Sequence, residues 1–259
     1  MFPQILALDF DGVICDGLKE YFASTERAYK KIWSSNDLSV NDELTNNFYR
    51  LRPVIETGWE MPVLLRALVL NYDPEKILTT WHYIRDEIVE REQLDKKTCS
   101  QALDSVRDYW IQNDLDGWLK LHRFYPGVLD KLKEIISLDI QFYIITTKEG
   151  RFVKQLLQQQ GIELNETQII GKESKRPKYE TLRIIKNNAT ELDVSIWFVE
   201  DRIQALKQVQ QQPDLKAIKL FLADWGYNTE PQRAMAKQLN NIQLLSLSQF
   251  DRDFDLWLR

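Results

Sequence analysis

The sequence is poor in cysteine and histidine and has no long apolar run, and each scarcity excludes a class of protein. Cys15 and Cys99 are too few and too far apart to form a disulfide framework. Two isolated histidines, His82 and His122, do not make a zinc site. No uncharged apolar stretch approaches the roughly 18 residues that span a bilayer. The segment from Met1 to Asp9 is too short for a secretion signal and lacks its basic start, so we expect a soluble, cytoplasmic protein.

Positive charge is not in excess either. The chain has 34 lysines and arginines against 39 aspartates and glutamates, a net charge of -5. Such a chain has no overall attraction to nucleic acid or to anionic membranes, so we expect neither as a partner. Any anionic substrate must meet local positive charge. A length of 259 residues suits a core domain that carries a second lobe, in a monomer or a homodimer.

Glycine is absent between Gly58 and Gly117, and a helical pattern surrounds this gap. From Lys19 to about Arg123, apolar and aromatic residues recur at spacings of three and four, and no strand pattern interrupts them. A stretch of this length, placed just after an apolar run, predicts a separate helical lobe. The helices expected after the first are Asp42 to Leu51, Pro62 to Leu70, Pro74 to Arg91 and Lys97 to Leu121.

After Tyr125 the pattern changes to short apolar runs that alternate with helical stretches. This alternation predicts βαβ units and a parallel sheet, which the early apolar run Gln4 to Phe10 would join as a strand buried on both faces. The fold class is therefore α/β, a Rossmann-like parallel sheet with an inserted all-helical domain. We expect a core domain of residues 1–16 and 124–259 and a helical domain of residues 17–123. The other expected strands are Gln141 to Thr146, Gln168 to Ile170, Ser195 to Val199, Ala217 to Leu222 and Ile242 to Leu245.

Two carboxylates, Asp9 and Asp11, lie at the C-terminal end of the first of these strands. Open α/β sheets bind ligands at the carboxyl ends of their strands. Adjacent carboxylates repel unless a cation or a proton lies between them, and Mg²⁺ is a hard ion that prefers oxygen ligands. The sequence Asp-x-Asp-Gly also opens ordinary turns, so this segment alone does not decide between a metal site and a loop.

Polar groups also lie at the C-terminal ends of two other expected strands. The segment Thr146-Thr147-Lys148 offers hydroxyls and a helix N-terminus that can bind a phosphate oxygen, although such a threonine is often only a helix cap. Glu200 and Asp201 form a second carboxylate pair that could complete an oxygen-rich metal site, although acidic residues also simply begin helices.

The basic segment of residues 172–178 precedes another helix. It is either a solvated loop or the source of a cation that neutralises a phosphate and a nucleophilic carboxylate. Two of its lysines, Lys175 and Lys178, are candidates for that cation.

These elements occur in the order found in the haloacid dehalogenase-like hydrolases, which the chain resembles in its core. Asp9-Phe10-Asp11-Gly12-Val13 is similar to the first motif of that superfamily, Thr146 to the second, Lys178 or Lys175 to the third, and Glu200-Asp201 to the fourth. Lys178 directly opens a helix, as in the phosphoserine phosphatase pattern, and is the favoured lysine. The helical insertion is similar only in length and helicity to the cap of phosphoglycolate phosphatase and β-phosphoglucomutase relatives.

The resemblance implies a Mg²⁺-dependent phosphatase that hydrolyses a small phosphorylated metabolite through an aspartyl-phosphate. Asp9 would be the nucleophile, Asp11 the acid and base, and Thr146 with Lys178 would bind the phosphoryl oxygens. The metal would be held by Asp9, by Asp11 through its carbonyl, and by Asp201 with Glu200. Dehalogenase relatives lack an acid at the position of Asp11, so its presence favours phosphoryl transfer.

Candidate substrate contacts extend beyond these motifs. Thr147 and Lys148 follow the second motif, while Arg52 and Gly58 lie in the helical insertion, where an arginine fork or a turn could meet a small anion. The simpler interpretation of that region is structural: Trp59 is a packing residue, and Arg50 and Arg52 form surface ion pairs. A phosphomutase of the β-phosphoglucomutase type and a catalytically idle binding protein of the same fold are the competing functional hypotheses.

Overall fold

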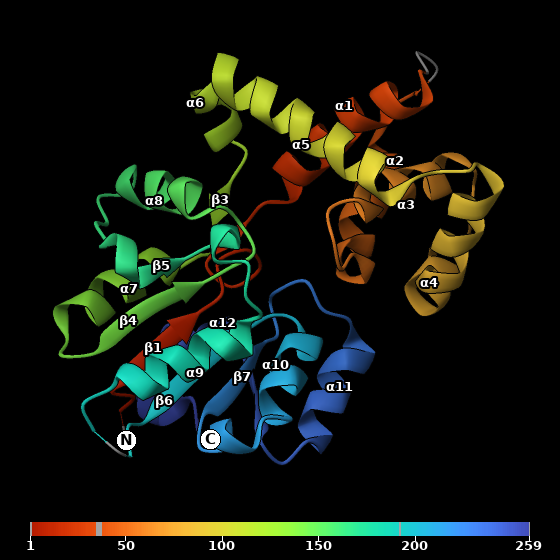
Figure 1. The fold of residues 1–259 in the computed structure, drawn as a ribbon. Coiled ribbons are helices and arrows are strands. Elements are labelled where there is room, and N and C mark those ends of the chain that lie inside the picture. The colour runs from red at the N-terminus through yellow and green to blue at the C-terminus, as the bar shows by residue number, and fades with distance from the viewer. Residues whose placement is uncertain (1, 35–37, 192, 259) are drawn as a thin grey trace. The chain divides into compact units, whose positions relative to one another are not determined.

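Six parallel strands of the described residues form one sheet, in the order β5-β4-β1-β6-β7-β8 (Figure 1). The computed structural model describes residues 2–34, 38–191 and 193–258, so the expected domain ends Met1 and Arg259 lie outside the described residues. β1 lies between β4 and β6, with Ile5 opposite Gln141 and Ile196. The predicted α/β fold class is confirmed. The strands are β1 Ile5–Leu8, β4 Gln141–Ile145, β5 Ile169–Ile170, β6 Ile196–Glu200, β7 Lys219–Ala223 and β8 Ile242–Leu245.

The strand residues are apolar on both faces of the sheet, and helices cover one of these faces. Ile5 of β1 and Phe198 of β6 belong to one buried apolar cluster, together with Leu182 and Leu206. These leucines come from α9 (Lys178–Asn188) and α10 (Ile203–Gln210), which lie against the sheet (Figure 1). The remaining helices of this part are α7 Val128–Ser137, α8 Gly150–Gln158, α11 Glu230–Gln238 and α12 Leu247–Phe250.

An aromatic cluster packs on the alternate residues of β6 and β7. Trp197 and Phe221 lie on neighbouring strands with ring centroids 5.1 Å apart. Trp257 stacks on Phe250 at 5.1 Å and meets Phe254 at 5.0 Å. Its centroid is also 5.8 Å from that of Trp197. The C-terminal segment thus covers part of the sheet with large, buried rings rather than with a long helix.

The chain divides into two compact units, one of residues 1–16 and 123–259 and one of residues 17–122. The chain leaves the first unit after Asp16 and returns to it at Arg123, and these two residues pair in a short antiparallel ribbon of β2 (Cys15–Asp16) and β3 (Arg123–Phe124). The second unit is helical. Its helices are α1 Leu18–Trp33, α2 Asp42–Leu51, α3 Glu60–Val69, α4 Pro74–Arg91, α5 Lys96–Asn113 and α6 Leu115–Leu119.

The expected single helix from Lys97 to Leu121 is wrong, because Asp114 divides it. Asp114 has φ −155° and ψ 67°, outside the helical region, and its carboxylate accepts the N–H of Gly117 at 2.9 Å. A side chain that caps a new helix in this way competes with continuation of the old one. The apolar spacing persists through the break and therefore could not reveal it.

A buried carboxylate joins three helices of the second unit. Glu20 of α1 is fully buried and accepts two hydrogen bonds from Arg107 of α5, at 2.8 and 2.9 Å. It also accepts from Ser24 and from the indole of Trp118 on α6. A bidentate, fully hydrogen-bonded pair offsets the desolvation of both charges and fixes how these helices pack. Within the described residues, no helix is long and apolar enough to cross a membrane.

We expect Trp257→Ala to lower the free energy of unfolding by about 3–5 kcal/mol, because it removes a buried aromatic ring and leaves a cavity. Trp257 is 1 % exposed. The measurement is urea denaturation followed by circular dichroism. Leu138→Ala, at a residue 41 % exposed in the same unit, is the control and should change the value by less than about 1 kcal/mol. Equal effects of the two changes would contradict a stabilising role for the aromatic cluster.

Candidate active site

The carboxyl ends of three neighbouring strands bring the expected site residues together. Asp9 directly follows β1, and its N–H donates to the carbonyl of Val199 at 2.9 Å, which continues the strand pairing. Thr146 directly follows β4 and donates to Ile170 at 3.0 Å. Glu200 is the last residue of β6. Because these strands are parallel and adjacent, the three side chains share one edge of the sheet.

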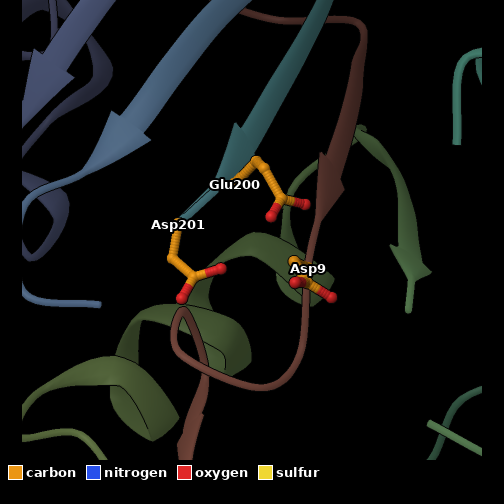
Figure 2. Close-up of side chains that lie close together, drawn as sticks. All are labelled: Asp9, Glu200 and Asp201. Atoms are coloured by element: carbon orange, nitrogen blue, oxygen red, sulfur yellow. The ribbon is translucent and has the colours of Figure 1, made fainter. Parts of the chain in front are cut away.

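Three buried carboxylates lie close together at this edge (Figure 2). One oxygen from each of Asp9, Glu200 and Asp201 lies within 4.8 Å of the other two. All three side chains come from residues that are at most 6 % exposed. Carboxylates at this spacing suit a shared cation, since each offers a hard oxygen ligand.

Lys178, the first residue of α9, reaches into this carboxylate cluster. Its Nζ lies 2.9 Å from Asp9 Oδ1 and 2.6 Å from Glu200 Oε2. Lys175 is exposed and has a left-handed φ of 51°, at the end of the 3₁₀ turn Lys172–Ser174. The structure therefore brings Lys178 to the candidate nucleophile, and it leaves Lys175 on the surface.

A second lysine meets Asp11. The Nζ of Lys148 lies 3.2 Å from Asp11 Oδ1, and its side chain is only 8 % exposed. The main-chain N–H of Lys148 donates to Thr146 Oγ1 at 3.1 Å, which fixes the turn after β4. Thr147, between them, is exposed. The sequence marked Lys148 as a substrate contact but gave no sign of its contact with Asp11.

Burial and charge shift the proton affinities in the cluster. Burial, and then the negative charge of Glu200, raise the pKa of Asp9 to about 7, although Lys178 opposes them. Burial also raises the pKa of Glu200, again against Lys178 and with Asp201 adding to the rise. Burial disfavours the charge on Lys178, but the charges of Asp9 and Glu200 outweigh it and raise the pKa of Lys178. The lysine therefore stays charged while the carboxylates compete for a proton.

The charge count of this edge suits a divalent cation. Its carboxylates, Asp9, Asp11, Glu200 and Asp201, outnumber its lysines, Lys148 and Lys178, by two. In the protein alone, burial raises the pKa of Asp9 and of Glu200, and the neighbouring carboxylates add to the rise, so protons compensate part of this excess. A hard divalent ion would relieve it without protonation, and the all-oxygen donor set fits Mg²⁺.

Two glycines allow the loop carrying Asp201 to approach its neighbours. Gly12 has φ +88°, and a Cβ there would lie 2.2 Å from Asp201 Oδ2. A Cβ on Gly226 would lie 2.3 Å from Asp201 Cβ and 2.5 Å from the carbonyl oxygen of Gly12. Real side chains do not fit at such distances, so the loops after β1, β6 and β7 meet only because both residues are glycine.

The loop after β7 also holds Asp201 by hydrogen bonds. The N–H of Tyr227 donates to Asp201 Oδ2 at 2.7 Å, and Asn228 Nδ2 donates to the Asp201 carbonyl at 3.0 Å. The sequence analysis marked neither Tyr227 nor Asn228 as a site residue. The Gly-Tyr-Asn run that begins four residues after the predicted strand Ala217 to Leu222 was the signal that could have located this loop.

The expected substrate contacts of the helical insertion lie within the second unit. Arg52 places its guanidinium 4.8 Å from the ring centre of Tyr21 and donates to the carbonyl of Ile55. Gly58 lies in the turn before α3, where a Cβ would touch Leu103 at 3.1 Å. Arg50 forms an ion pair with Glu75 of α4. Each of these residues therefore has structural contacts inside its own unit.

No family model and no curated protein matches the sequence. Solved structures do match it. A hydrolase of the haloacid dehalogenase-like family from Streptococcus pneumoniae is 15% identical, with a TM-score of 0.57 over 93% of this chain and 94% of that one. A predicted phosphatase from Clostridium acetobutylicum is 14% identical, with a TM-score of 0.55 over 97% of both chains.

A third match is protein tyrosine kinase A from Mycobacterium tuberculosis, 13% identical, with a TM-score of 0.56 over 98% of this chain and 95% of that one. These matches and the parallel sheet define an α/β protein with a Rossmann-like core. More particularly, the chain has the fold of the haloacid dehalogenase-like hydrolases, as the resemblance of its motifs predicted. Because proteins with this fold carry names for different reactions, the site must carry the functional argument.

We expect Mg²⁺ affinity to weaken about fivefold between pH 7 and pH 6 and to level off above pH 8. The raised pKa of Asp9, about 7, means that the protein without metal holds a proton there at pH 6, which Mg²⁺ must displace. Calorimetric titration with Mg²⁺ in buffers of different ionisation enthalpy measures both the affinity and the proton released. An affinity independent of pH, with no proton released, would contradict the role of Asp9 as a ligand.

We also expect Gly226→Ala to weaken Mg²⁺ binding at least tenfold, because the new methyl group would overlap Asp201 and the main chain of Gly12. Calorimetry again gives the affinity. Gly161→Ala is a matched control, since Gly161 has φ +71° but no atom within 4 Å of its would-be Cβ. That change should cost about 1–2 kcal/mol of stability through backbone strain and leave Mg²⁺ affinity unaltered. The same Mg²⁺ affinity in both variants would refute the packing argument.

Proposed function

We propose that this protein is a Mg²⁺-dependent phosphatase of the haloacid dehalogenase-like superfamily that hydrolyses a small phosphorylated metabolite. The observation that carries the proposal is the placement of Lys178 against Asp9 at the carboxyl end of β1. A carboxylate held beside a fixed cation, with a second carboxylate two residues on, has the parts needed to attack a phosphoryl group and to move a proton.

Asp9, Glu200 and Asp201 would hold the metal, with the carbonyl of Asp11 as the further ligand expected from the resemblance. When bound, Mg²⁺ supplies positive charge that screens the repulsion between an anionic nucleophile and an anionic phosphate ester. The buried, all-oxygen cluster supports this assignment. Lys178 already neutralises part of the same cluster, so the site favours a divalent over a trivalent charge.

In the first half of the reaction, Asp9 attacks phosphorus. A bond forms between an Asp9 carboxylate oxygen and phosphorus, and the bond between phosphorus and the leaving-group oxygen breaks. Asp11 donates its proton to that leaving oxygen, so the alcohol departs uncharged. Lys178 and the hydroxyl of Thr146 bind the phosphoryl oxygens, whose charge must be balanced throughout. The product on the enzyme is a phosphorylated Asp9.

In the second half, water replaces Asp9 on phosphorus. Asp11, now a carboxylate, removes a proton from the water as its oxygen bonds to phosphorus. The bond between phosphorus and Asp9 breaks, which releases inorganic phosphate and restores the Asp9 carboxylate and the Asp11 acid. Lys148, 3.2 Å from Asp11, holds that side chain and offers a positive charge to substrate oxygens.

The helical unit would act as a cap that selects the substrate and excludes water. This role follows from its insertion between β1 and the rest of the sheet, where the two connections run through β2 and β3. Arg52 and Gly58 remain candidate contacts for the part of the substrate that does not react.

The test is hydrolysis of a panel of phosphorylated metabolites and of p-nitrophenyl phosphate, with and without Mg²⁺. We expect Asp9→Asn to lower kcat by about 10³-fold or more, and Asp11→Asn by about 10²- to 10⁴-fold. Asp214→Asn is the control, because Asp214 forms an ion pair with Arg183 outside the site and should leave kcat unchanged. Turnover retained by Asp9→Asn, or full activity in a chelator, would refute the mechanism.

Two other outcomes identify the competing functions. Conversion of a sugar phosphate into its isomer, without release of inorganic phosphate, would favour a phosphomutase that uses the same residues. A chain that binds phosphate esters without turning over any of them would be a binding protein. Mass spectrometry of the protein quenched during turnover distinguishes either enzyme from a binding protein, because a phosphatase and a phosphomutase both phosphorylate Asp9 and a binding protein does not.

A further inference from the structure

Tyr227 makes two hydrogen bonds that join different parts of the first unit. Its main-chain N–H donates to Asp201 Oδ2 at 2.7 Å, and its hydroxyl donates to Asp16 Oδ1 at 3.0 Å. One buried residue therefore contacts both a candidate metal ligand and a residue of the β2–β3 ribbon. Neither contact belongs to the catalytic steps proposed above.

Asp16 occupies a particular place in the chain. It is the last residue of the first unit before the chain enters the helical unit, and it pairs with Arg123, the first residue after the chain returns. The two connections between the units therefore run side by side at this pair. The hydrogen bond from Tyr227 to Asp16 therefore attaches both connections, at one point, to the loop after β7.

The segment that carries Tyr227 has little freedom to move independently of Asp201. Asn228 Nδ2 donates to the carbonyl oxygens of Asp201 and Ala223, at 3.0 and 2.7 Å. Trp225 Nε1 donates to the carbonyl of Val13 at 3.1 Å, in the loop that follows Asp9 and Asp11. A displacement of this segment must therefore move the Asp201 carboxylate or break several buried hydrogen bonds, each of which is costly to leave unpaired.

A second tyrosine completes the contact with the ribbon. The side chains of Tyr125 and Tyr227 share a hydrogen bond, and Tyr125 follows directly after β3. Burial, and then the charges of Asp16 and Asp201, raise the pKa of Tyr125, so its hydroxyl keeps its proton near neutral pH.

We propose that Tyr227 is a positioning residue that couples the junction residue Asp16 to the metal-binding carboxylate Asp201. The proposal rests on the proposed function only for the role of Asp201 as a ligand. Displacement of the β2–β3 ribbon changes the orientation of Asp201 through Tyr227, and hence the Mg²⁺ affinity. The coupling is reciprocal, so Mg²⁺ bound at Asp201 also stabilises the hydrogen bond between Tyr227 and Asp16.

The test is calorimetric titration with Mg²⁺ of wild type, Tyr227→Phe, Asp16→Ala and the double variant. Tyr227→Phe keeps the ring and the main-chain N–H and removes only the hydroxyl. We expect each single change to weaken Mg²⁺ binding about 3- to 10-fold, and the double variant to bind no more weakly than the weaker single variant. Such non-additivity is the mark of two residues that act through one contact.

Controls separate positioning from a general loss of structure. Tyr143→Phe removes a hydroxyl from a partly buried tyrosine of β4 in the same unit and should leave Mg²⁺ affinity as in wild type. A purely structural role for Tyr227 would lower the melting temperature without a matching loss of Mg²⁺ affinity. If Tyr227→Phe does not fold, Asp16→Ala alone must still weaken Mg²⁺ binding for the proposal to stand.

Unchanged Mg²⁺ affinity in Tyr227→Phe, or effects that add in the double variant, would overturn this proposal and leave the proposed function intact. Failure of the proposed function gives a different result. In that case wild type binds no Mg²⁺, or Asp201→Asn binds it as wild type does, and both proposals fall together.

Discussion

Electrostatic repulsion among buried carboxylates is the constraint on which the organisation of this edge of the sheet depends. β1 and β6 are adjacent and parallel, so the carboxylates that follow them are forced together in a region from which water is largely excluded. Uncompensated charge is very costly there. The surrounding segments supply compensation through Lys178 and through main-chain N–H groups that donate to the carboxylates.

The position of Lys178 illustrates how far this compensation goes. It begins α9, where the partial positive charge of a helix N-terminus disfavours a cation by about 0.3–1 kcal/mol. Its contacts with Asp9 and Glu200 offset that cost. The same carboxylates keep the lysine protonated although it is largely buried. A neutral residue would suit the helix better, so the lysine is explained by the site rather than by the helix.

Much of this arrangement could be predicted from the sequence, because strand ends in a parallel sheet share an edge. Apolar runs located the strands, and the helical spacing of apolar residues, with a proline at the start of α4, placed α2 and α4 at their observed bounds. The positions of the strands were enough to group Asp9 and Glu200 in one site. The contact of Lys148 with Asp11 and the clamp of Tyr227 on Asp201 depend on loop conformations after β4 and β7, which no periodic pattern encodes. The break at Asp114 escaped detection for the same reason.

The strand order also determines when the candidate site can form during folding. β1 is central, yet its two neighbours, β4 and β6, begin at Gln141 and Ile196. As the chain leaves the ribosome, the strand that precedes Asp9 must wait until more than half of the sequence is made before either edge is paired, while the helices of residues 17–122 can pack within their own unit. Such non-local pairing slows folding and leaves apolar strand edges exposed in the interval. Synthesis of the nascent chain is thus a period of vulnerability to aggregation.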